Sequence, residues 1–153
     1  INARGEPRVL EFNVRMGDPE TQPILFRLDS DLLDLLEAAV DQRLDAVRPQ
    51  WNPQPTLGVV MAAGNYPGTP QKGDEISGLD ADLGAAKVFH AGTAERDGKV
   101  VTSGGRVLCV VAKGASVRAA QQIAYAAVAQ IHWNGVQFRR DIGYRAVERE
   151  ESR

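Results

Sequence analysis

The sequence has 153 residues, of which 43% are hydrophobic, and its 18 Lys or Arg against 20 Asp or Glu give a formal net charge of −2 at pH 7. This length allows one ordinary core, or a compact domain with a piece of another. The lack of a basic excess argues against nucleic acid or an anionic membrane as a partner. No apolar run is long enough to span a bilayer, so the sequence predicts a soluble, cytoplasmic protein.

The one cysteine, Cys109, lies inside an apolar run and excludes a disulfide within the chain. A cysteine in such a run is predicted to be a small buried hydrophobe rather than a nucleophile. His90 and His132 have no cysteine or carboxylate near them at the spacing of metal ligands, so both are interpreted as structural. The residues outside the first segment therefore indicate no metal site.

Alternation in residues 8–15 predicts an amphipathic strand whose polar face carries Glu11, Asn13 and Arg15. A carboxylate and an amide oxygen are hard ligands suited to Mg²⁺, and a guanidinium suits the phosphate that Mg²⁺ carries. The pattern favours a nucleotide-phosphate site, although alternation alone fits a strand with a wetted polar face. Because the first residue is Ile rather than Met, we expect the chain to begin inside a longer polypeptide, with the strand's partner partly missing.

The loop after this strand contains Asp18-Pro19-Glu20, which has the form of a helix start with Asp18 as N-cap. A helix start here would also turn free N–H groups toward an anionic substrate, and both interpretations can hold. The sequence does not say whether Asp18 or Glu20 contacts substrate. A second helix of about four turns is predicted from Leu32 to Leu44, with N-cap candidates at residues 29–31.

Prolines in residues 49–55 cannot continue a helix and mark a predicted linker. Beyond it, the strands at residues 87–93, 99–102 and 106–112 are predicted to form an antiparallel meander that turns at Asp97-Gly98. A further strand at residues 56–63, a helix from Val117 to about Ile131 capped by Ser116, and a frayed charged end at residues 148–153 complete the predicted elements.

The order Glu11-x-Asn13-x-Arg15, followed by Gly17-Asp18-Pro19-Glu20, resembles the metal-binding strand and the following loop of the glycinamide ribonucleotide synthetase family, the phosphoribosylamine-glycine ligases of the ATP-grasp superfamily. Four further stretches fit the family in the right order, so nearly the whole chain is covered. These stretches are residues 58–64, 88–93, 104–110 and 141–146.

The resemblance implies an α+β fold in two parts. Residues 1–48 would be the last strand, loop and helix of an ATP-grasp domain, and residues 56–153 a small C-terminal domain with an antiparallel sheet packed by a helix. The glycine-rich loop and most of the nucleotide pocket, which the family carries upstream, are absent from these residues. We therefore expect the N-terminal lobes of the same enzyme as partners and an isolated fragment without activity.

The family reaction joins glycine to 5-phosphoribosylamine with ATP, through an acyl phosphate, and gives glycinamide ribonucleotide, ADP and phosphate in purine biosynthesis. The resemblance implies that Glu11 and Asn13 bind Mg²⁺ or Mn²⁺ and that Arg15 binds the transferring phosphoryl group of ATP. It places Asp18 and Glu20 beside the glycine and amine chemistry as catalytic residues. The alternatives are another ATP-grasp ligase with a different carboxylate or amine, or a non-catalytic binding or assembly module.

Arg106 opens an apolar strand directly after Gly104-Gly105, where the backbone could come close to a ligand. The planar guanidinium group of Arg106 suits the binding of a phosphate group. In related purine ATP-grasp enzymes an arginine at the start of this strand binds the ribose phosphate, so the resemblance implies the same role for Arg106. Lys72, Arg139 and Arg140 are weaker candidates for that role, and solvated charge is their default interpretation.

Overall fold

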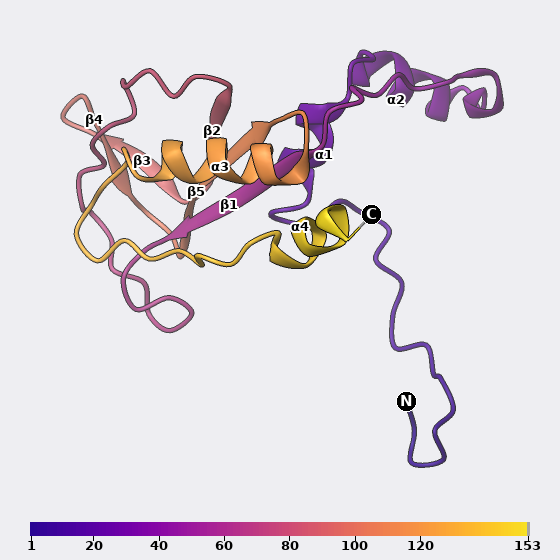
Figure 1. Cartoon of the computed structure of the whole chain (residues 1–153), viewed down its shortest axis with the longest axis horizontal. Helices are drawn as coiled ribbons and strands as arrows, with labels where there is room; N and C mark the ends of the chain where they lie inside the picture. The colour runs from indigo at the N-terminus through magenta and orange to yellow at the C-terminus, as the bar shows by residue number, and fades with distance from the viewer. Residues whose placement is uncertain (153) are drawn as a thin grey trace.

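The computed structural model describes residues 1–152, and a three-stranded antiparallel sheet of order β1-β5-β2 lies at its centre (Figure 1). Strand β1 spans Thr56–Ala62, β2 spans Ala86–His90 and β5 spans Arg106–Lys113. The middle strand, β5, is buried along residues 107–112 because it pairs on both sides, with Val59 and Val88 opposite Val110. A nearly continuous apolar run is the pattern expected of a strand covered on both faces.

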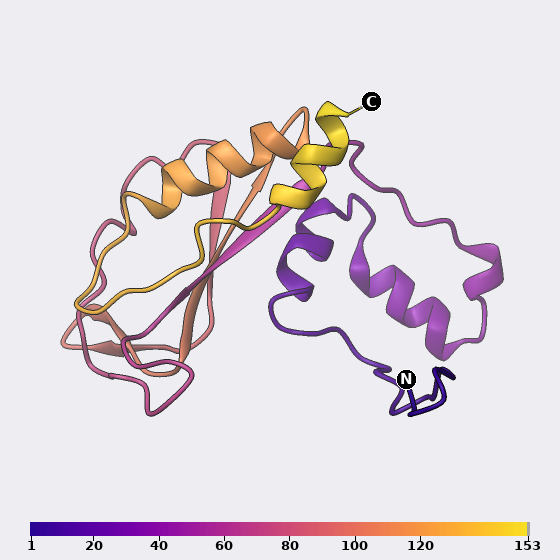
Figure 2. The same ribbon diagram turned by 60° about the horizontal axis from the view of Figure 1, so that its bottom comes forward.

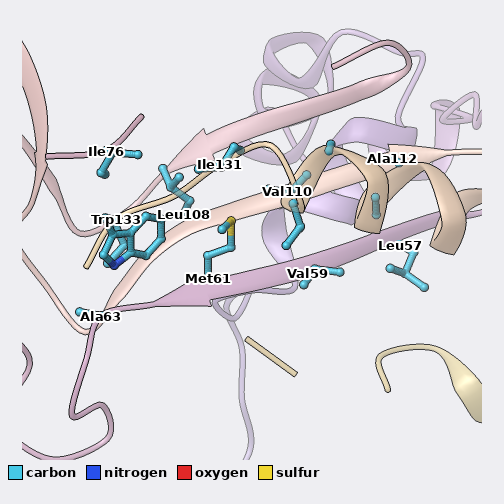
Figure 3. Packing of buried hydrophobic residues seen from close by; sticks show 14 of the residues in the cluster. Leu57, Val59, Met61, Ala63, Ile76, Leu108, Val110, Ala112, Ile131 and Trp133 are labelled. Carbon is cyan, nitrogen blue, oxygen red and sulfur yellow. The ribbon is translucent and has the colours of Figure 1, made fainter. Parts of the chain in front are cut away.

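Helix α3, Val117–Val128, covers one face of the sheet. Its first turn is capped as predicted, since the Ser116 hydroxyl accepts a hydrogen bond from the Ala119 N–H at 3.0 Å. The helix ends three residues earlier than expected. The main core lies between this helix and the sheet, and Figure 3 shows its labelled side chains gathered there, among them Leu57, Val59, Met61, Leu108, Val110, Ile131 and Trp133.

Helix α1, Thr21–Arg27, packs against β1 and β5 (Figure 2). The Phe26 ring meets the Phe89 ring edge-on with centroids 6.2 Å apart, and the Lys113 ammonium lies 4.5 Å from the Phe26 centroid. Side chains alternate along β5, so Cys109 lies on the face opposite Leu108 and Val110. Cys109 is 1% exposed, which confirms the prediction of a buried cysteine.

The predicted meander is wrong. Strand β3, Thr93–Arg96, pairs with β4, Lys99–Thr102, in a separate two-stranded sheet. Their turn is at Asp97-Gly98 as predicted, with φ of 52° and 73°. Strand β2 pairs with β5 rather than with β4, because the chain bends at residues 91–92 and the double-sided burial of β5 draws β1 and β2 to its two edges.

The predicted strand at residues 8–15 is also wrong for this chain, because these residues form neither strand nor helix and all are exposed (Figure 1). A strand needs a neighbour for its backbone N–H and C=O groups, and no other segment among residues 1–152 pairs with this one. The alternation of side chains survives locally, since the Asn13 amide donates to Glu11 Oε1 at 3.1 Å.

Helix α2 spans Leu32–Val40 and is capped as predicted by Asp31, whose carboxylate accepts from the Leu33 N–H at 2.8 Å. It stops short of Leu44, because Gln42 adopts a left-handed φ of 56° and the short 3-10 helix η1, Leu44–Ala46, follows. Backbone hydrogen bonds from Asp29 N to Gln50 O and from Asn52 N to Arg27 O join the chain after η1 to the end of α1.

Helix α4, Tyr144–Glu151, replaces most of the predicted frayed end, while residue 153 lies outside the described residues. The Glu150 carboxylate accepts from the Val117 and Arg118 N–H groups at 2.9 and 3.3 Å, and Arg118 pairs with Glu151. Free N–H groups at the start of α3 therefore order the charged end. The observed α+β architecture agrees with the predicted class. Within residues 1–152, no helix has both the length and the apolarity needed to cross a membrane.

Candidate functional site

A pocket of about 380 Å³ opens where β1 ends and β5 begins. Its apolar walls include Val60 and Ala62, which alternate with the core residues Val59 and Met61 and so belong to the sheet face opposite α3. Tyr66 comes from the turn after β1, and Phe138 from the segment before α4. The pocket also has Gln137 and two charged residues, Arg106 and Arg139, in its lining.

Arg106, which lines this pocket, pairs with Asp18. The Nε of Arg106 lies 3.0 Å from Asp18 Oδ2, with 42% and 41% of the two side chains exposed. The second carboxylate oxygen, Asp18 Oδ1, accepts from Gln22 Nε2 at 3.1 Å. Two residues that the sequence predicted separately therefore stand side by side, and the exposure leaves both accessible to a ligand.

Asp18 does not cap α1, which corrects the predicted helix start. The helix begins at Thr21 with Glu20 at the N-cap, and the carboxylate of Asp18 is engaged by Arg106 and Gln22 instead. Glu20 closes the loop in another way, since its Oε2 accepts from the Gly17 N–H at 3.0 Å. Asp18 is consequently oriented by Gln22 of α1 and by Arg106 of β5 rather than by the backbone N–H groups at the start of α1.

The glycines before Arg106 have an internal packing role. A Cβ on Gly105 would lie 2.4 Å from the Tyr66 ring, and one on Gly104 would lie 3.1 Å from Gly92. Both distances are shorter than ordinary contact, so a side chain at either position would require its neighbour to shift. The space that was predicted to admit a ligand at Gly104-Gly105 is filled by Tyr66 and Gly92. The packing of Gly104 against Gly92 and of Gly105 against Tyr66 therefore positions the backbone just before Arg106.

Gln137 is a pocket residue that the sequence reasoning missed. Its side-chain amide donates to Ala63 O at 2.9 Å and to Tyr66 O at 2.7 Å. Its backbone exchanges hydrogen bonds with Ala62 at 2.8 and 3.0 Å. Gln137 therefore fixes the turn that carries Tyr66. Nothing in its local sequence points to this role, because its partners lie more than seventy residues earlier in the chain.

Burial and the nearby charge of Asp18 both change the pKa of the Cys109 thiol. Burial raises the pKa of the Cys109 thiol to about 11, and the negative charge of Asp18 adds to the effect. His90 has its Nδ1 3.1 Å from the Thr93 hydroxyl and does not line the pocket. Neither residue has the features of a nucleophile or a metal ligand.

Glu11, Asn13 and Arg15 lie in the exposed segment that runs away from the sheet (Figure 1). The structure does not bring them to Arg106 or Asp18. Glu11 and Asn13 offer oxygen donors, which suit Mg²⁺ or Mn²⁺. Across residues 1–152 no cluster of three or more His, Cys, Asp or Glu could hold a metal ion. The donors present fit such an ion in type but are too few to hold it alone.

The fold and the pocket define a small α+β domain with arginines at the edge of an apolar pocket, an arrangement suited to an anionic ligand. The family model for the C domain of phosphoribosylglycinamide synthetase matches residues 56–145. The chain belongs to the phosphoribosylglycinamide synthetase family.

Similar proteins carry a consistent name. Phosphoribosylamine-glycine ligase of Xanthomonas axonopodis pv. citri is 60% identical over 151 residues, which cover 98% of this chain and 35% of that protein. The enzyme of the same name from Pseudomonas aeruginosa is 59% identical with the same coverage. A crystal structure of phosphoribosylamine-glycine ligase from Thermotoga maritima matches with a TM-score of 0.68 and 36% identity over 90% of this chain and 34% of that one. The chain thus spans about a third of the length of these relatives.

Proposed function

We propose that this chain is part of an ATP-dependent ligase that joins glycine to 5-phosphoribosylamine and forms glycinamide ribonucleotide, ADP and phosphate through an acyl phosphate. The names of the relatives support this proposal. The structural observation that carries it is the pairing of Asp18 with Arg106, which lines the apolar pocket. A cation for the phosphate and an acceptor for the amine are the groups that such a substrate requires.

Arg106 binds the 5′-phosphate of phosphoribosylamine in this proposal. Its contact with Asp18 uses Nε, and the two terminal nitrogens are the ones that would donate to phosphate oxygens. The apolar walls at Val60 and Phe138 would pack against the carbon face of the ribose. Asp18 and Glu20 lie in one loop, and we place them on the side of the glycine and amine groups.

The nucleotide end of the reaction involves the first segment and the lobes that precede it in the complete enzyme. Glu11 and Asn13 would supply two oxygen ligands to Mg²⁺ or Mn²⁺, and Arg15 would bind the transferring phosphoryl group of ATP. The metal, when bound, neutralises charge on the nucleotide phosphates. Because only two donors of the right type come from this chain, the nucleotide and the upstream lobes must complete the coordination.

Steady-state kinetics of the complete enzyme test the proposal. Losing a hydrogen bond to a charged partner costs roughly 1.5–3 kcal/mol, so Arg106→Ala should raise the phosphoribosylamine KM about ten- to a hundredfold at about 1.4 kcal/mol per decade. The KM values for ATP and glycine should hardly change, because the phosphate is remote from the reacting carboxyl. Arg106→Lys should recover part of the loss, since the point charge of an ammonium group replaces a planar guanidinium group that can donate two hydrogen bonds at once.

Unchanged KM values with only a lower thermal stability would make Arg106 a structural residue. Two alternatives are separated in the same assay. Another ATP-grasp ligase would turn over a different carboxylate or amine in place of glycine or phosphoribosylamine. A non-catalytic module would show no turnover and no Mg²⁺-dependent binding of ATP.

A further inference from the structure

A second arginine lies at the pocket of Arg106. Arg139 lines the pocket from the segment before α4, whereas Arg106 lines it from the start of β5. The remaining walls are mainly apolar, with Val60 and Phe138 among them. Each guanidinium is paired with one carboxylate, Arg106 with Asp18 and Arg139 with Asp141, and each keeps terminal nitrogen atoms outside that pair that can donate to an anion.

Arg139 is held in a defined orientation. Its Nε and Nη2 donate to the two carboxylate oxygens of Asp141 at 2.9 and 2.7 Å. The same hydrogen bonds hold the pKa of the Asp141 carboxyl below its ordinary value. A bidentate pair fixes the plane of the guanidinium. Among the bonds of residues 1–152, none uses the third nitrogen, Nη1.

The backbone of Arg139 is clamped as well. The Tyr125 hydroxyl donates to Arg139 O at 2.7 Å and accepts from the Ile142 N–H at 3.1 Å. One side chain of α3 thereby holds both ends of the short segment that carries Arg139 and Asp141. The Arg139 side chain remains 70% exposed, so a ligand from solvent can reach it.

Arg140, the next residue along the chain, differs from Arg139 in its position relative to the pocket. Its guanidinium carbon lies 5.3 Å from the centroid of the Phe138 ring, in a cation–π contact. It does not line the pocket. The two adjacent arginines carry the same charge a few ångströms apart along the chain, and only one of them borders the space for a ligand.

We propose that Arg139 is a second phosphate-binding residue of this pocket and that it holds the phosphate of the phosphoribosyl substrate together with Arg106. This proposal rests on the function proposed above. Nη1 of Arg139 donates to a phosphate oxygen while Asp141 and Tyr125 keep the group in place. Arg106 and Arg139 come from two separate segments. A phosphate monoester suits such a pair, because its three terminal oxygens can accept hydrogen bonds from both arginines.

The experiment measures the affinity of the complete enzyme for ribose 5-phosphate by isothermal titration calorimetry, with ribose as the phosphate-free control. Arg139→Ala should weaken binding of ribose 5-phosphate about tenfold, since one charge-assisted hydrogen bond is lost. Arg140→Ala is the matched control and should change the affinity by less than about twofold, because an exposed charge off the pocket is screened. Arg139→Gln is a second variant if Arg139→Ala melts at a much lower temperature, since it keeps a donor for Asp141.

The outcomes separate the two proposals. Equal weakening by Arg139→Ala and Arg140→Ala would show a general effect of charge and overturn the inference. Weakening by Arg106→Ala with no effect of Arg139→Ala or Arg139→Gln would overturn it while leaving the proposed function in place. If neither Arg106→Ala nor Arg139→Ala weakens binding, the pocket does not hold the phosphate and both proposals fail. Ribose should bind all variants alike, and a selective loss of ribose binding by Arg139→Ala would also contradict the inference.

Discussion

Cys109 is a single residue whose environment changes its acid–base chemistry. It lies beneath α1 on the sheet face opposite α3, and burial together with the charge of Asp18 raises the pKa of its thiol from 9.0 to about 11. The unfolded chain therefore loses this proton at lower pH than the folded one. The contribution of the neutral thiol to stability is complete below about pH 9 and is lost as the pH rises toward about 11.

The first prediction compares the 153-residue chain with its Cys109→Ala variant in urea unfolding. The wild-type free energy of unfolding should fall relative to the variant by about 1–2 kcal/mol between about pH 8 and about pH 10.5. The variant lacks the thiol but keeps every tyrosine and lysine, so the difference isolates Cys109. A difference between the two proteins that does not vary with pH would contradict the assignment.

The second prediction concerns the metal ligands. In the complete enzyme, Glu11→Gln should lower Mg²⁺-dependent turnover by about two orders of magnitude or more, since it removes an anionic ligand and keeps the shape. Glu6→Gln is the control, because Glu6 is an exposed carboxylate of the same segment that pairs with Arg8. Turnover of the Glu11 variant within a fewfold of the parent across a Mg²⁺ titration would remove Glu11 from the site.

The sequence patterns pointed to single residues, and they could not indicate contact between distant ones. Asp18 and Arg106 were each proposed from their neighbours in sequence, yet their 3.0 Å contact has no local pattern. Arg139 and Arg140 could not be separated from the sequence, because only the folded pocket distinguishes the one that lines it. Gln137 escaped notice for the same reason.

At the scale of elements, several signals that act within a few residues were correct, although the predicted cap at Asp18 was not. The caps at Ser116 and Asp31 and the turn at Asp97-Gly98 were predicted and are present. The order of the strands was not predicted correctly, because it depends on which strand is buried on both faces. The segment 8–15 has the alternation of a strand, but alternation cannot supply the neighbour that a strand needs.

The third prediction tests how the loop before β2 is anchored on α3. Gly78 has a φ of 82°, and a Cβ there would lie 1.9 Å from Gln130 O, just after the end of α3, whereas Gly84 has a φ of 60° with no atom within 4 Å. Both positions are left-handed, which costs an alanine about 1–2 kcal/mol. Gly78→Ala adds a backbone clash and should therefore destabilise the chain by clearly more than Gly84→Ala in urea unfolding. Similar losses for the two variants would show that the loop can move away from α3.

At the scale of the whole molecule, two apolar faces lack a covering. Leu10 and Val14 are 96% and 91% exposed, and the α2 residues Leu33 and Val40 are 60% and 83% exposed. Side chains of this kind are normally buried in a folded protein, and faces of this kind mark surfaces that contact something else. Because the chain spans about a third of the length of its relatives, we propose that the remainder of the enzyme covers both faces.

Hydrogen exchange provides the last prediction, on the segment 8–15. In the 153-residue chain its amides have no backbone acceptor among residues 1–152, so they should exchange at rates close to those of an unfolded peptide. In the complete enzyme a neighbouring strand should pair with them and slow their exchange by at least about a hundredfold. Helix α3 is the internal control, since it packs on the sheet in the main core and should be slow in both proteins. Equally fast exchange of residues 8–15 in the complete enzyme would mean that the segment stays unpaired, and Glu11 and Asn13 would then lack the rigid strand that a shared metal site requires.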